Sequence, residues 1–245
     1  MRQLKVLVPV VLPVLLVALV AAGTASATLP TLLTAGHVLV TAEKFSQAST
    51  ASVTSLSTLG QTREMECKKN ATTATELKEK EPEVGVFSYA GPFHIEFAEC
   101  KSTGAGGEAC TGAGENAGVI LVLGEAHLVE DILTSEGALG AALLFLLSTT
   151  NDVDYTCHVV GIPITFKVLG AVVCLIKPVN TIVKHFELVY ERGGVGDQKE
   201  VHYWNDKGVQ QTAELKTSIN GAAEEMSAQA GTSLVLSELE VEIMV

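Results

Sequence analysis

Apolar and polar residues alternate along much of this chain. Phe93, Ile95 and Phe97 alternate with His94 and Glu96, so in an extended segment the two sets lie on opposite faces. A period of two is typical of strands with one buried and one solvated face. The same pattern, or a short apolar run, predicts strands at 38–41, 63–67, 119–123, 153–160, 164–176 with a break at Gly170, 186–190 and 234–243. Many short strands of this kind predict an all-β fold, an antiparallel β-sandwich or a barrel-like sheet.

One hairpin is predicted near the C-terminal end of the chain. Residues 201–204 and 209–215 have strand character, and Asn205–Gly208 joins them with an Asn-Asp-Lys-Gly sequence. Asn, Asp and Gly suit a tight turn, since each tolerates the backbone angles that a turn requires.

Three stretches are less regular. Residues 137–147 are strongly apolar and too short to span a bilayer, so they form a buried strand or a buried helix, and their context favours strand. Residues 71–81 are rich in Thr, Glu and Lys and fit a short exposed helix or a loop. Residues 46–60 are a Ser/Thr/Ala run that fits a loosely ordered lead-in or an edge strand.

The N-terminal 27 residues have the three parts of a secretory signal peptide. Arg2 and Lys5 precede an apolar run from 6 to 22, and Ala25-Ser26-Ala27 provides the small residues of a cleavage site before Thr28. An uncleaved membrane anchor is the alternative interpretation. We expect residues 1–27 to be removed and residues 28–245 to form a single β-rich exported domain, with 28–62 as a possible lead-in. The predicted location is therefore secreted, extracellular or cell-envelope-associated.

The cysteines fit an exported protein. All five lie beyond the predicted signal peptide, where oxidation is the default. A glycine-rich loop lies between Cys100 and Cys110 and lets its ends meet easily, which predicts a disulfide between them. We expect Cys67 and Cys157 to form a second pair and Cys174, in an apolar run, to be a buried free thiol. No Cys-x2-Cys spacing occurs, which argues against a zinc site.

The charge of the chain limits its partners. The net charge is −12, and losing Arg2 and Lys5 with the signal peptide makes it more negative. Because nucleic acids and anionic lipid surfaces are bound by clustered Lys and Arg, neither is an expected partner. After signal cleavage we expect no membrane span. The remaining partner classes are another protein, a glycan or a cation.

Catalytic motifs are absent from the sequence. It contains no Gly-x-Ser-x-Gly elbow, no P-loop and no His-Glu-x-x-His helix motif. Gly112–Gly118 is glycine-rich, but it precedes a strand, whereas a dinucleotide site needs a helix N-terminus. We therefore interpret it as a loop, and we assign no catalytic residues and no cofactor.

Weak metal-site candidates remain on the strands. His94 with Glu96, and His185 with Glu187, have the i, i+2 spacing that places two ligands on the same side of a strand. Asn151–Asp154 supplies oxygen ligands of the kind calcium takes, but a turn is the favoured role. A cleft that gathers two or more of these His and Glu side chains, or His202, would indicate an enzyme.

Aromatic residues make up only 5% of the chain, which argues against a broad sugar-stacking platform. Tyr203 and Trp204 are adjacent on a predicted strand, so one points inward and one outward. An exposed ring would suit a glycan, whereas the favoured role of Trp204 is in the core.

Several structural motifs together resemble secreted β-rich proteins of high-GC Gram-positive bacteria, a group with no established activity. The residues that carry this resemblance are Phe97–Cys100, Cys110, Gly112–Gly114, Phe166–Val172, Pro178–Asn180 and Glu240–Ile243. The resemblance implies export and β architecture, and it implies no site residues.

The sequence thus favours a non-catalytic exported or cell-envelope-associated β-sandwich with a binding or structural role. The loop at 100–110 and the Asn205–Gly208 turn are candidate contact tips, because loops on rigid sheets commonly carry function. The alternative is an extracellular hydrolase that uses a carboxylate pair or a His/Glu metal centre.

Overall fold

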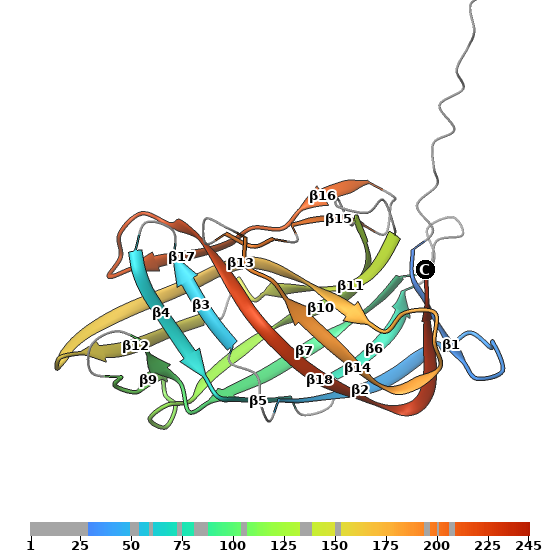
Figure 1. Cartoon of the computed structure of the whole chain (residues 1–245), viewed down its shortest axis with the longest axis horizontal. Helices are drawn as coiled ribbons and strands as arrows, with labels where there is room; N and C mark the ends of the chain where they lie inside the picture. Colours follow the sequence, from blue (N-terminus) through green and yellow to red (C-terminus); the bar gives the residue numbers. More distant parts are fainter. Residues whose placement is uncertain are drawn as a thin grey trace, which may run out of the picture.

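The protein is all-β in the part of the chain that the structure, a computed structural model, describes (Figure 1). No helix occurs there, and the strands are antiparallel, which confirms the predicted fold class. The described residues are 29–49, 54–58, 61–72, 75–80, 88–103, 107–132, 139–149, 153–193, 197–199, 201–205 and 209–245.

The described residues form eighteen strands of one sheet. In chain order they are β1 (Thr31–Thr34), β2 (Ala42–Ser49), β3 (Thr54–Thr58), β4 (Gln61–Cys67), β5 (Lys69–Thr72), β6 (Thr75–Lys80), β7 (Ser88–Ala98), β8 (Lys101–Ser102), β9 (Cys110–Gly112), β10 (Ile120–Ile132), β11 (Leu139–Leu147), β12 (Val153–Val159), β13 (Ile162–Lys177), β14 (Val183–Tyr190), β15 (His202–Trp204), β16 (Gln210–Thr212), β17 (Leu215–Ile219) and β18 (Glu225–Met244).

The strand pairings form a closed circuit. β7 pairs with β10, β10 with β11, β11 with β13, β13 with β14, and β14 with β18. β18 then pairs with β2, which returns to β7 through β5 and β6. A sheet that closes on itself has no free edge, so this part of the molecule is a barrel.

A second circuit continues the barrel along its axis. β18 pairs with β3, β3 with β4, and β4 with β8, and a single bridge between Lys101 and Ala109 links β8 to the strand leading into β9. β9 then pairs with β12, β12 with β13, β13 with β17, and β17 with β18. β13 and β18 belong to both circuits and run along the elongated body (Figure 1).

Gly170 lies where β13 passes from one circuit to the other. It pairs with Leu215 of β17, and the next residue, Ala171, pairs with Leu146 of β11. Its φ of 95° is in the region that favours glycine. The strand does not break at Gly170 as predicted: β13 continues through it, and Gly170 marks the change of neighbours within one long strand.

The interior is filled by the apolar face of each strand. On β7, Phe93, Ile95 and Phe97 are buried and His94 and Glu96 are exposed, as the alternation predicts. The core continues with the inward residues of the other strands, and the rings of Phe93 and Phe145 meet edge to face at 4.9 Å.

Two sequence predictions of local structure were wrong. Described residues within 71–81 belong to strands β5 and β6, because the inward Leu77 packs in the core and both neighbouring strands, β2 and β7, provide pairing partners. Residues 38–41 contain only an isolated bridge at Leu39 and form the connection between β1 and β2. In residues 71–81, pairing with neighbouring strands outweighed a composition that is compatible with a helix.

The other ambiguous segments are strands. β11 occupies the described part of 137–147, which confirms the preference for strand. β2 and β3 occupy the described residues of 46–60 and pair on both sides within the barrel, so they are not at an edge. β15 and β16 pair as the predicted hairpin. No helix among the described residues is long and apolar enough to cross a membrane.

Candidate functional site

The predicted metal ligands lie apart. His94 and Glu96 are exposed on β7, while His185 and Glu187 are exposed on β14, and β10, β11 and β13 separate these strands around the barrel. His202 is on β15, where its ring Nδ1 lies 3.2 Å from the Thr212 hydroxyl. Within the described ranges, no three His, Cys, Asp or Glu residues are grouped in a way that would hold a metal ion.

The remaining sequence candidates have structural roles. In the Gly112–Gly118 loop, the amides of Gly112, Ala113 and Gly118 donate to protein oxygens, so they are not directed at a phosphate. Asp154 is exposed on β12 opposite Lys167, and Asn151 and Asp152 lie outside the described residues.

The last sequence candidates are the two aromatic residues of β15 and the turn that follows them. Tyr203 and Trp204 are both half-buried, so neither offers a fully exposed ring to a sugar. At the candidate contact turn, Asn205 accepts from the Val209 amide through its side-chain oxygen at 2.9 Å. Residues 206–208 of this turn, like 104–106 of the other contact loop, lie outside the described part.

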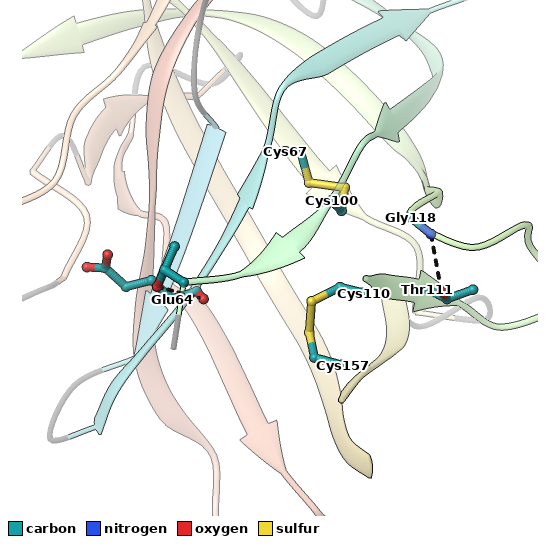
Figure 2. The surroundings of a disulfide bond; sticks show 8 residues. Glu64, Cys67, Cys100, Cys110, Thr111, Gly118 and Cys157 are labelled. Atoms are coloured by element: carbon teal, nitrogen blue, oxygen red, sulfur yellow. Dashed lines mark hydrogen bonds between the residues drawn. A yellow bond between two sulfur atoms is a disulfide. The ribbon is translucent and has the colours of Figure 1, made fainter. Parts of the chain in front are cut away.

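The disulfides join different partners from those predicted. Cys67 is bonded to Cys100 and Cys110 to Cys157, as Figure 2 shows, so the predicted Cys100–Cys110 and Cys67–Cys157 pairs are corrected. Cys174 is free and buried, as predicted.

The register of four strands explains this pairing. The four half-cystines form a row across β4, the start of β8, β9 and β12. Cys100 and Cys110 are hydrogen-bonded neighbours, since the Cys110 amide donates to the Cys100 carbonyl at 2.9 Å, and Cα atoms are further apart at such positions. The two bonded pairs have Cα–Cα separations of only 3.9 and 4.1 Å. Each half-cystine is therefore bonded to the cysteine on the neighbouring strand whose Cα lies closer. The glycine-rich loop gave no information on this register.

Two apolar hollows lie inside the barrel. These cavities, of about 40 and 70 Å³, lie in the lumen and share Phe93, Ile95 and Phe145 as wall residues. Nearly all of their lining is apolar. Phe93 takes its place because Gly124 has no side chain: a Cβ there would lie 2.6 Å from the Phe93 ring.

A few polar groups interrupt this apolar lining. Gln47 of β2 lines the first cavity and is only 5% exposed, and its Nε2 has no hydrogen-bond partner in the described part of the protein. Tyr190 of β14 lines the second cavity. Burial raises the pKa of Tyr190 well above its ordinary value, the neighbouring Cys174 raises it further, and Gln47 acts in the opposite direction. The effect of Gln47 on this pKa is that of a hydrogen bond donated to the Tyr190 oxygen, so the two side chains lie within reach of each other, although the contact is too poorly aligned to satisfy Nε2.

Cys174 completes this polar group. Its thiol donates to the Leu143 carbonyl at 3.4 Å, and burial raises its pKa to about 12. A thiol with such a pKa stays protonated and is a poor nucleophile at neutral pH. The group can thus hydrogen-bond a bound molecule, and burial favours the protonated forms of both its thiol and its phenol.

The buried charges are all negative. Glu43, Glu130 and Asp131 are buried, whereas no Lys, Arg or His is buried among the residues that the structure describes. Glu43 is satisfied, because its Oε1 accepts from the Ser237 hydroxyl at 2.5 Å and from the Leu239 amide at 2.9 Å. The interior therefore offers no countercharge to an anionic guest.

Sequence reasoning missed this lumen site. The only available signal was that Glu43, Phe45 and Gln47 alternate with other residues, but two polar residues on the inward face concealed the strand pattern. No family model, curated protein or solved structure matches this chain.

Proposed function

We propose that this protein is a non-catalytic exported or cell-envelope-associated binding protein that holds a small apolar molecule in the barrel lumen. The pair of enclosed apolar cavities around Phe93 and Phe145 carries this proposal. In the closed circuit β5 and β6 share one position between β2 and β7, which gives eight positions around the barrel. A barrel of that size is just wide enough for its own side chains or one small ligand, and dry apolar cavities bind small hydrocarbons.

Two further observations support the assignment. The disulfides suit an oxidising, exported environment. The polar group beside the cavities includes an amide and a phenol, which fix the orientation of a ligand without reacting with it. The alternative of an extracellular hydrolase gains no supporting observation, because the His and Glu candidates are exposed on separated strands.

Xenon and benzene are the probes, because xenon is a single atom that suits either cavity, whereas benzene needs more room than either cavity has alone and so tests the two together. We expect saturable ¹²⁹Xe chemical-shift changes and a melting temperature that rises with benzene concentration, since a ligand that binds only the folded state stabilises it. Val172→Ile adds one methylene to the wall of the second cavity and should weaken binding. Val209→Ile makes the same change at a residue that is 49% exposed, and it should leave binding unchanged.

The proposal fails if neither probe gives a saturable response in the folded protein. It also fails if Val172→Ile and Val209→Ile affect binding equally, because the response then arises outside the lumen.

A further inference from the structure

We infer that the lumen ligand is an uncharged molecule with a hydroxyl or carbonyl group that hydrogen-bonds to Gln47. This inference rests on the proposed function, and it adds the chemical class of the ligand and the residue that selects it.

Gln47 lies at a gap in the pairing of β2. β2 pairs with β6 up to Phe45 and with β5 from Ala48 onward, so Ser46 and Gln47 lie between the two ladders. The first cavity reaches this interval, where the partly exposed Thr72 and Thr75 line it together with Ser46 and Gln47. The polar side of the cavity is therefore the side nearest to solvent.

The amide of Gln47 has hydrogen-bonding capacity to spare, because Nε2 carries two N–H donors and Tyr190 could accept only one of them. A buried amide without a partner destabilises a protein, and a native structure rarely retains one without a reason. An oxygen acceptor on a bound molecule would satisfy Nε2, and the Tyr190 hydroxyl close by would provide a second contact. Because Gln47 lines one cavity and Tyr190 the other, the polar group of the ligand would lie where the cavities adjoin.

The charge of the interior excludes ionised ligands. A carboxylate or phosphate buried here would find no Lys, Arg or His among the described buried residues to compensate its charge. A cation would be left beside apolar walls, with Glu43 already engaged by Ser237 and Leu239. Short alcohols and ketones combine the required neutral polar group with a hydrocarbon portion.

The test compares 1-hexanol, hexanoate and benzene at pH 7 by calorimetry with wild-type protein and two variants. Gln47→Leu removes the amide and keeps the apolar volume, and Gln210→Leu makes the same change at an exposed residue of β16. We expect wild type to bind hexanol, and to bind hexanoate at least tenfold more weakly. Gln47→Leu should lose about tenfold in hexanol affinity, the value of one hydrogen bond, and keep its benzene affinity.

Tyr190→Phe provides a second variant if Gln47→Leu does not fold, and it should weaken hexanol binding selectively. Equal hexanol affinity in wild type and Gln47→Leu, or hexanoate binding as tight as hexanol, overturns the inference. In that case benzene or xenon binding by the wild type leaves the proposed function intact, whereas a wild type that binds neither benzene nor xenon rejects the proposed function itself.

Discussion

Single buried polar side chains set the character of this barrel's interior. Gln47 and Glu130 occupy inward positions in a mostly apolar interior, and each has an atom without a hydrogen-bond partner in the described part of the chain. Isolated polar groups of this kind are either functional or destabilising. Gln47 lines a cavity, which links it to ligand binding, but Glu130 does not.

Glu130 is expected to make stability depend on pH. It lies opposite Ala141 and Trp204 and is 1% exposed, and burial raises its pKa above the ordinary value of 4.5. The folded state therefore binds this proton more tightly than the unfolded state does. Protonation of Glu130 contributes to the free energy of unfolding below pH 4.5, and this contribution is lost as the pH rises through the folded-state pKa.

Glu130→Gln should remove this dependence. We expect it to raise the free energy of unfolding at pH 8 by about 1–3 kcal/mol, the penalty of an unpaired buried acceptor, and to have a smaller effect at pH 5. Urea unfolding at both pH values measures this, with Glu240→Gln at an exposed position as the matched control. A gain that is the same at both pH values would show that the carboxylate does not titrate differently on folding.

At the scale of elements, long strands shared between the two circuits hold the barrel together. β13 and β18 each pair with different neighbours along their length, so a bend is needed where the neighbours change. In β13 this bend is Gly170. A Cβ there would lie 2.0 Å from the Glu214 carbonyl oxygen, which accepts the Ala171 amide and is thereby held in place.

Replacing Gly170 by Ala should be strongly destabilising. Gly170→Ala combines a positive φ with this backbone clash, and we expect it to lower the free energy of unfolding by about 3 kcal/mol or more. Gly161→Ala is the matched control, because Gly161 also has a positive φ but a Cβ there meets nothing within 4 Å. It should lower stability by about 1–2 kcal/mol. Equal effects of the two substitutions in urea unfolding would contradict the role of the Glu214 contact.

The sequence predicted elements more reliably than their connections. Strands such as β7 follow from alternation because each residue's environment repeats every two positions. Strands β5 and β6 could not be predicted, because their Thr, Glu and Lys residues depend on pairing with β2 and β7 for their conformation. The predicted disulfide pairs were wrong for a similar reason, since the strand register that brings Cys67 to Cys100 depends on residues far apart in the sequence. The lumen site was missed because it is assembled from residues on many strands.

At the scale of the whole molecule, the cysteines and the N-terminal sequence lead to one joint expectation, which tests whether the chain is exported. Four cysteines are bonded in the structure, and Cys174 is 0% exposed with a pKa raised to about 12 by burial. Alkylation requires an accessible thiolate, so the folded protein should not react. Signal peptidase cleavage after Ala27 would remove the only predicted targeting segment.

Intact mass of protein from the exported fraction measures both features. We expect a chain that begins at Thr28, with no alkylated cysteine when folded, one after denaturation without reductant, and five after reduction. Cys174→Ala should reduce these numbers to none, none and four, which assigns the single thiol to Cys174. Three labels in the unreduced, denatured protein would mean that one disulfide is absent, whereas a mass that retains residues 1–27 would favour the membrane-anchor interpretation. Since only strand register brings the bonded cysteines together, recovery of the Cys67–Cys100 and Cys110–Cys157 peptides from the same sample would also test the second circuit of the barrel.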